Sequence, residues 1–180
     1  ALMNSNAVEE KIREIISAGK IVSKYVATSV SGHSVIIKKV TLPIMSKEEL
    51  DESIHWEAEQ YIPFDIKDVN MDAQILDNSD SASGKMDIIL VAAKSDLVND
   101  YSAVIKNSGL EPVIIDVAAF ALQNCYEQNY GINPQDTLVL VNIGAASTNM
   151  NIISKGKSIF TRDLNIGGKN YTDEIQKQMN

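Results

Sequence analysis

The segment at residues 137–168 constrains the fold of this chain more than any other. It contains a buried apolar run, a turn of small residues at 144–147, two more strand-like runs around a Lys-Gly-Lys turn, and a Gly-Gly step into a helical pattern. The lack of side-chain bulk at Gly144 lets backbone amides and the hydroxyls of Ser147 and Thr148 approach a phosphate. The turn is therefore a candidate nucleotide pocket.

On the residues alone, two interpretations of this turn stay open. A β-branched side chain would hinder close approach at Gly144, and a helix that opens near Gly167 and Gly168 would point free amides at an anion. An ordinary β-hairpin has the same order of strand, glycine turn and strand, and turn statistics favour that plainer interpretation. The turn needs further support before it can be assigned to a ligand.

Length, charge and composition limit the class of protein. The chain has 180 residues, of which 44% are hydrophobic, enough for one large or two small domains with real cores. A net charge of -8 argues against a nucleic-acid partner, because phosphate contacts need clustered Lys and Arg. The apolar runs are too short to span a bilayer. The single Cys125 excludes an internal disulfide and fits a reducing compartment, so we expect a cytoplasmic protein.

Changes of apolar period divide the chain into helices and strands. Helical spacing predicts helices near residues 8–19, 46–61, 96–108 and 117–130. Alternating or continuous apolar runs predict strands at residues 25–30, 34–42, 69–76, 86–93 and 111–116. Ser46 and Glu49 have the spacing of a capping box, and Pro63 is expected to end the helix that they begin. The helix at 117–130 is apolar on nearly every side, and we therefore expect it to be central.

The order of elements changes in the middle of the chain. From about residue 41 to residue 108 the order is strand, helix, strand, strand, helix, unlike the alternating pattern around it. A polar tract at residues 78–84 interrupts this piece and is expected to be the tip of a hairpin, not a domain linker. The piece therefore predicts an inserted subdomain.

Several motifs follow one another along most of the chain. The first are Tyr-Val-Ala-Thr-Ser-Val-Ser-Gly-His at residues 25–33, Val-Ile-Ile-Lys-Lys at 35–39 and Glu-Ala-Glu-Gln-Tyr-Ile-Pro-Phe-Asp at 57–65. The others are Val-Asn-Ile-Gly-Ala-Ala-Ser-Thr-Asn-Met-Asn-Ile-Ile at 141–153, Ile-Phe-Thr-Arg-Asp at 159–163 and Ile-Gly-Gly at 166–168. The last group resembles the second phosphate motif of the actin, Hsp70 and sugar-kinase superfamily. The whole series, in this order, resembles the PilM family of type IV pilus assembly proteins.

The resemblance implies an α/β protein with a partial actin-like ATPase fold, a ribonuclease H-like mixed sheet, and an inserted small α+β subdomain like that of the division protein FtsA. Residues 1–40 and 109–136 would form parts of the first actin-like subdomain, 41–108 the inserted subdomain, and 137–180 the start of the second actin-like subdomain with the phosphate hairpin. A helix begins after Gly168 and stops at Asn180 without a capping signal, so we expect a fragment truncated at both ends.

The resemblance implies a nucleotide site of which only half is visible. The first phosphate motif and the adenine-contacting turn have no counterpart here. We therefore expect the full-length protein to bind ATP and Mg²⁺, and we do not expect this fragment to bind them tightly. Asn142 stands where the superfamily carries an Asp that orders a magnesium-bound water, which places hydrolysis in more doubt than binding. No catalytic or metal-ligating residue is assigned. The candidate nucleotide-binding residues are Asn142, Gly144, Ala145, Ser147, Thr148, Gly167 and Gly168.

An aromatic cluster supplies the candidate partner site. Trp56 falls about 120° or more from the apolar stripe of its helix, and Tyr61, Pro63 and Phe64 follow at the helix end. Such a composition is typical of binding anchors, and packing between the inserted and main subdomains explains it equally well. In the family, the cytoplasmic tail of the inner-membrane protein PilN docks in a groove between those two parts. The resemblance implies that the cluster is one wall of this groove.

Two functions remain from these observations. The preferred hypothesis is a non-enzymatic cytoplasmic adaptor of type IV pilus assembly, which binds ATP in its full-length form with weak or absent ATPase activity. It would be recruited to the inner membrane by the N-terminal tail of a PilN-like protein, without inserting itself. The alternative is an active ATPase or small-molecule kinase of the actin and Hsp70 superfamily, against which Asn142 counts. Contacts with other pilus proteins and a homo-oligomer are compatible with the resemblance.

Overall fold

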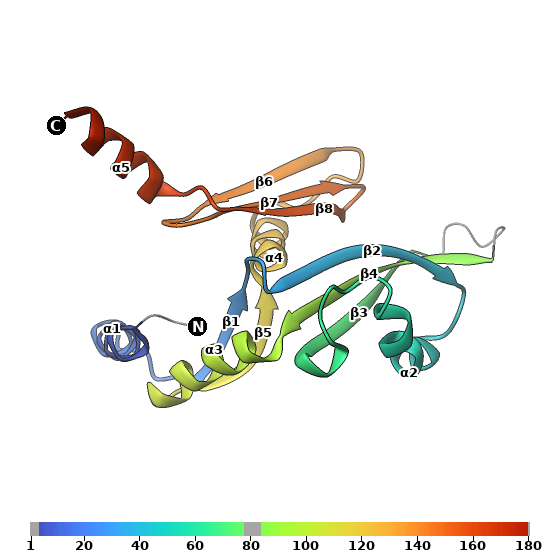
Figure 1. Cartoon of the computed structure of the whole chain (residues 1–180), viewed down its shortest axis with the longest axis horizontal. Coiled ribbons are helices and arrows are strands. Elements are labelled where there is room, and N and C mark those ends of the chain that lie inside the picture. Colours follow the sequence, from blue (N-terminus) through green and yellow to red (C-terminus); the bar gives the residue numbers. More distant parts are fainter. Residues whose placement is uncertain (1–3, 78–83, 180) are drawn as a thin grey trace.

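The computed structural model describes residues 4–77 and 84–179, which form helices and strands in mixed order (Figure 1). They are α1 (Ser5–Ala18), β1 (Tyr25–Val30), β2 (Val35–Pro43), α2 (Lys47–Ala58), a 3-10 turn (Ile66–Asp68), β3 (Val69–Asp77), β4 (Lys85–Lys94), α3 (Ser95–Asn107), β5 (Glu111–Val117), α4 (Ala118–Tyr130), β6 (Thr137–Ile143), β7 (Thr148–Ser154), β8 (Lys157–Leu164) and α5 (Gly168–Met179). The helices and strands expected from apolar period are confirmed. The tract expected as a hairpin tip lies outside the described residues, apart from Gly84.

The described strands form three sheets, so the expected mixed α/β class is confirmed. Strands β1 and β5 pair in parallel, whereas the β2-β4-β3 and β6-β7-β8 sheets are antiparallel. Figure 1 shows α4 between the parallel pair and the β6-β7-β8 sheet, with α2 beneath the β2-β4-β3 sheet. None of the described helices combines the length and apolar character that a membrane crossing needs.

The largest core lies between α2 and one face of the β2-β4-β3 sheet. Ser46 Oγ accepts a hydrogen bond from Glu49 N (3.2 Å), and Glu49 Oε2 accepts one from Ser46 N (2.7 Å), which confirms the capping box. The helix ends at Ala58, before Pro63, and its buried stripe is Leu50, Ile54 and Ala58. Alternate residues of the strands complete this core: Val40, Leu42, Ala73, Met86, Ile88, Leu90 and Ala92. The opposite alternation leaves the other face of the same sheet turned toward β8 and α4.

Strand β2 runs through the predicted boundary at residue 41. It pairs with β4 along its whole length from Val35 to Pro43, so the sheet of the proposed insertion begins before that boundary. The division of the chain into four parts stays a prediction.

Helix α4 lies between the parallel pair and the β6-β7-β8 sheet, but most of it is not buried, contrary to the expectation from its composition. Ala119 is its one buried residue within the part of the chain that the structure describes, and Tyr130 is 79% exposed. One side of the helix is attached to the β6-β7-β8 sheet by Asn151, whose Nδ2 donates to Ala119 O (3.2 Å) and to Gln123 Oε1 (3.1 Å). When apolar residues occur on every side of a helix, the sequence cannot indicate which side packs against the rest of the protein.

Candidate functional site

The turn between β6 and β7 has the shape that the sequence predicted. Gly144 N donates to Ser147 O (2.9 Å) and closes a tight turn, in which Ala145 and Ala146 are exposed. Among the described residues, no acceptor faces the amides of Ala145, Ala146 and Ser147. Adjacent amides without a protein acceptor can bind an anion. The turn therefore has donors available for a phosphate.

The start of α5 does not offer the free amides that we expected. Gly168 N donates to Gly144 O (2.8 Å), Lys169 N to Ala145 O (2.8 Å), and Gly167 N to the side chain of Asn170 (2.9 Å). The carbonyl groups of the turn thus occupy the position in which an anion would meet the helix N-terminus. The expectation of free amides at Gly167 and Gly168 is wrong for this arrangement, while a role for these two residues in nucleotide binding stays a prediction.

The two glycines differ in how closely the turn approaches them. A Cβ atom at Gly167 would lie 2.7 Å from the backbone of both Gly144 and Ala145, too close for any real side chain. A Cβ at Gly168 would lie 3.7 Å from Gly144 O, an ordinary contact. Nearby, Thr148 Oγ1 donates to Ile166 O (2.6 Å). Glycine at 167 is thus required for docking α5 onto the turn, whatever the turn binds.

A chain of polar contacts runs from this hairpin to the turn between β1 and β2. Asn142 Nδ2 donates to Asn149 Oδ1 (3.3 Å), Asn149 Nδ2 donates to Asp163 Oδ1 (2.6 Å), and Gly32 N donates to Asp163 Oδ2. Asn149 is only 7% exposed. Sequence reasoning missed Asn149 and Asp163. The available signal was a polar residue in the middle of an apolar strand, which requires a buried partner.

Three neighbouring cavities lie between the β2-β4-β3 sheet and the elements β8 and α4. Their volumes are about 390, 250 and 280 Å³. The first and second share Ile89 and Ser158, and the second and third share Ile37, Lys38 and Thr161. They are therefore continuous along β2 and β8. We call them the inter-sheet groove, lined by residues 37–39, Ile89, Phe120, Gln123, Asn124 and residues 158–161.

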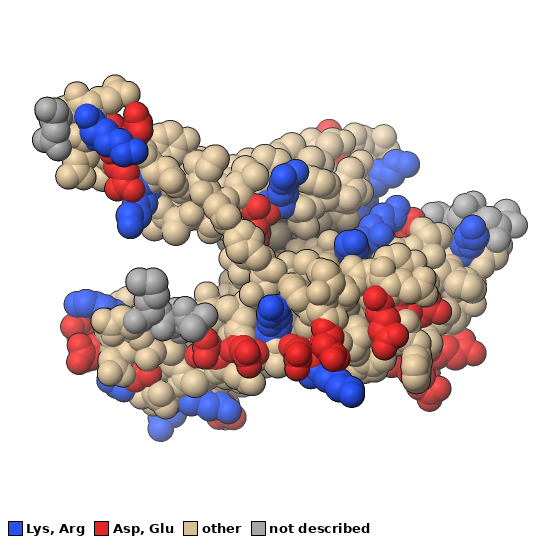
Figure 2. Space-filling model, viewed as in Figure 1, with Lys and Arg blue, Asp and Glu red and all other residues tan. Residues whose placement is uncertain are grey.

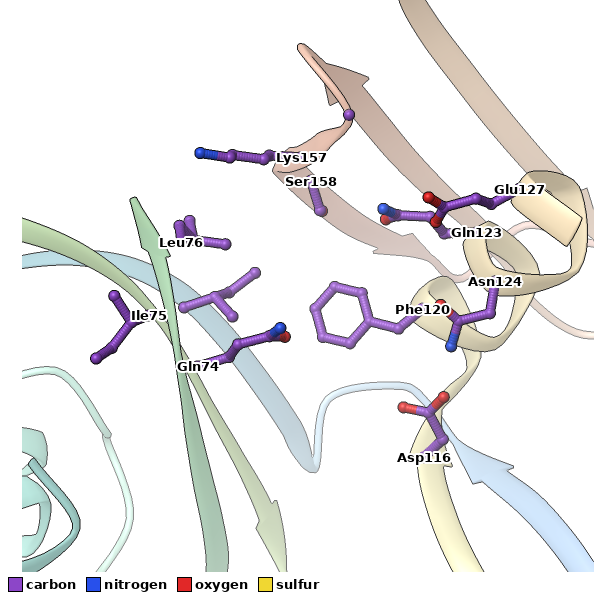
Figure 3. A pocket seen from close by; sticks show the side chains of 12 residues that line it. Gln74, Ile75, Leu76, Asp116, Phe120, Gln123, Asn124, Glu127, Lys157 and Ser158 are labelled. Carbon is purple, nitrogen blue, oxygen red and sulfur yellow. The ribbon is translucent and has the colours of Figure 1, made fainter. Parts of the chain in front are cut away.

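Figure 3 shows the largest of these cavities, with Gln74 of β3 and Phe120 of α4 pointing toward one another. The rest of its wall comes from β3, β4 and β5 and from α4 and β8. Ser158 Oγ donates to Asn151 Oδ1 (2.6 Å), and Asn151 also bonds to α4, so one buried amide fixes both elements. The wall therefore has a defined position before any ligand enters.

Lysine side chains belong to the rim of the inter-sheet groove. Figure 2 shows Lys and Arg at the hollow between the upper and lower parts of the molecule. Lys39 Nζ lies 2.7 Å from Asp87 Oδ2. Hydrogen bonds from Lys39 and from Thr41 lower the pKa of Asp87. Lys39 is thus partly neutralised.

The structure does not bring the four candidate partner residues together. Tyr61 and Phe64 pack against the core between α2 and the sheet, and Lys94 Nζ lies 4.5 Å from the centre of the Phe64 ring. Trp56 is 76% exposed on another side of α2, and Pro63 is also exposed. None of the four lines the inter-sheet groove, because they lie on the face of the sheet that α2 covers. Their role as one wall of a docking groove, and their contact with a partner, stay a prediction.

Comparison with known proteins identifies the family. The sequence model of the family described as Type IV pilus assembly protein PilM matches residues 1–180. Among solved structures, the chain is similar to a chain of a PilM-PilN type IV pilus biogenesis complex, with 28% identity and a TM-score of 0.85. That match covers 98% of this chain and 53% of the other, so the present chain spans about half the length of that relative.

Two more distant likenesses show the fold alone. One is the cytoplasmic domain of EpsL, an inner-membrane component of the type II secretion system of Vibrio cholerae, with 13% identity, a TM-score of 0.58 and coverage of 87% of this chain and 56% of that one. The other is MreB5 of Spiroplasma citri bound to ADP, with 16% identity, a TM-score of 0.51 and coverage of 99% and 36%. These neighbours have the actin-like ATPase fold. With that fold and a family match over its whole length, the chain belongs to the PilM family of type IV pilus assembly proteins.

Proposed function

We propose that this chain forms part of an actin-like adaptor of type IV pilus assembly, which acts at the inner membrane by binding the N-terminal tail of a PilN-like protein. The observation that carries the proposal is the similarity, over 98% of the chain, to a chain of the PilM-PilN complex. The inter-sheet groove is the proposed place for the tail. This assignment replaces the aromatic cluster as the wall of the docking site.

The shape and the borders of the groove suit an extended peptide. Strands β2 and β8 are both edge strands of their sheets, and residues 37–39 and 158–161 of these strands line the groove. An edge strand presents unpaired backbone groups, with which an extended peptide can pair. Phe120 adds an apolar contact at one end. The tail would gain its affinity from backbone pairing and one buried anchor.

Substitution of Phe120 tests the proposed site. Phe120→Ala should weaken binding of a labelled tail peptide by roughly 25-fold, as loss of an interface anchor worth ~2 kcal/mol does. Fluorescence anisotropy measures the affinity. Tyr130→Ala is the matched control, since Tyr130 is an aromatic residue of the same helix that is 79% exposed and lies outside the groove.

The control keeps the result interpretable. A thermal melt of both variants gives the folded fraction of each, and the measured affinities are corrected for this fraction. If Phe120→Ala and Tyr130→Ala bind the tail equally well per folded molecule, the groove assignment is wrong.

The proposal includes ATP as a ligand of the longer parent protein. The exposed amides of Ala145 and Ala146 and the hydroxyl of Ser147 fit a phosphate group, because the described residues leave these amides without an acceptor. The hydroxyl of Thr148 donates its hydrogen to Ile166 O. It therefore has only lone pairs left and cannot donate a hydrogen bond to the phosphate. Bound Mg²⁺ would supply charge neutralisation for the phosphates. The side chain of Asn142 would only orient water, since it carries no charge.

A further inference from the structure

Trp56 is one of several large apolar side chains that are exposed outside the inter-sheet groove. It is 76% exposed, although the stripe Leu50, Ile54 and Ala58 of the same helix is buried against the sheet. A buried indole contributes a large apolar area to an interface, and tryptophan is enriched among interface anchors. Trp56 therefore marks a surface separate from the core and from the groove.

A shallow apolar cavity surrounds Trp56. It has a volume of about 530 Å³ and lies between α2 and the segment that follows β2. Its helical residues recur at the i, i+3, i+4 and i+7 spacing of one helix face. Ser53 Oγ lies 3.5 Å from Met45 Sδ, which joins the segment to the helix. We call this site the α2 surface, formed by Ile44, Met45, Glu49, Glu52, Ser53 and Trp56.

Acidic side chains border this cavity. Glu49 is fixed by the capping box, and Glu52 makes no salt bridge within the part of the chain that the structure describes. Lys47 of the same helix is already paired with Asp51 (2.6 Å) and donates to Ala73 O (3.0 Å). Figure 2 shows Asp and Glu gathered on the side of the molecule where α2 lies. The cavity thus has an apolar floor and a negative rim.

We propose that the α2 surface docks a basic, amphipathic segment of a second protein, distinct from the tail in the inter-sheet groove. An Arg or Lys of that segment stacks on the Trp56 indole and pairs with Glu52, and an apolar side chain contacts Ile44 and Met45. Charge complementarity selects this occupant. The negative rim repels an anionic membrane surface, which would attract a basic patch instead. Because the two sites lie on opposite faces of the β2-β4-β3 sheet, one chain can hold both partners.

Fluorescence of Trp56 tests this proposal directly, because the sequence contains one tryptophan. The probe is a short synthetic peptide that alternates Arg and Leu, and its control carries Glu in place of each Arg. The basic probe should shift Trp56 emission to shorter wavelength in a saturable way, and the acidic control should not. Glu52→Lys should weaken binding roughly tenfold or more, whereas Glu10→Lys, on the exposed face of α1, should change it by less than about twofold.

Each contrary outcome removes the proposal. If Glu52→Lys and Glu10→Lys weaken binding of the basic peptide equally, the peptide is attracted by the net charge of the chain alone. An equal emission shift on vesicles of phosphatidylcholine and phosphatidylserine in equal parts would assign the surface to a membrane. A dimer of the chain, seen by sedimentation and dissociated by Glu52→Lys, would assign it to a second copy. Circular dichroism of the variants confirms that α2, whose buried stripe is unchanged, remains helical.

Discussion

Gly167→Ala lowers the free energy of unfolding by about 2–3 kcal/mol, because the added Cβ would lie 2.7 Å from the backbone of Gly144 and Ala145. Neither backbone can move without breaking the bonds that hold α5 to the turn, Gly168 N to Gly144 O and Lys169 N to Ala145 O. Urea unfolding followed by circular dichroism measures the loss. Hydrogen exchange at the amides of Gly168 and Lys169 shows whether α5 detaches locally.

The neighbouring glycine supplies the control for this result. Gly168→Ala introduces the same methyl group with 3.7 Å to its nearest contact, so it should be neutral or stabilise by up to ~1 kcal/mol through helix propensity. Equal effects of the two substitutions would show that the turn does not approach Gly167 as described.

Asp163→Ala removes about 2–4 kcal/mol of stability, since it leaves two donors without an acceptor. One is the amide of Asn149, which is 7% exposed, and the other is the backbone amide of Gly32. Thermal and urea unfolding measure the change. Asp173→Ala is the matched control, because Asp173 is exposed on α5 and should have an effect below ~0.5 kcal/mol.

A double-mutant cycle separates this contact from a general loss of charge. Asp163→Ala and Asn149→Ala should be non-additive by about 1 kcal/mol or more, as expected for residues that share one hydrogen bond. Additive effects would contradict the hydrogen bond between Asn149 of β7 and Asp163 of β8.

The sequence predicted the local structure well because its signals are local. The capping box at Ser46 and Glu49 needs residues three apart, and the turn at Gly144 needs one residue without a side chain. Helical spacing also placed Trp56 outside the buried stripe, and its 76% exposure agrees. Such signals depend on a few neighbouring residues, so a single sequence contains them.

The functional surfaces were harder to predict because distant segments form them. A Gly-Gly step allows close approach of either an anion or another chain segment, and only the position of the Gly144 and Ala145 carbonyl groups decides between these. Phe64 follows the end of α2, where helical period no longer gives the direction of a side chain. The inter-sheet groove joins edges of two sheets, residues 37–39 and 158–161, that no local pattern relates.

The central claim is that a PilN-like tail binds in the inter-sheet groove, and amide chemical shifts of the ¹⁵N-labelled chain test it most directly. Addition of the tail peptide should shift the amides of Ile37, Ile89 and Thr161, which line the groove, in proportion to saturation. The amide of Trp56 should stay unchanged, since the α2 surface lies across the sheet. Shifts confined to the residues around Trp56, with Ile37, Ile89 and Thr161 unaffected by a bound tail, would contradict the account.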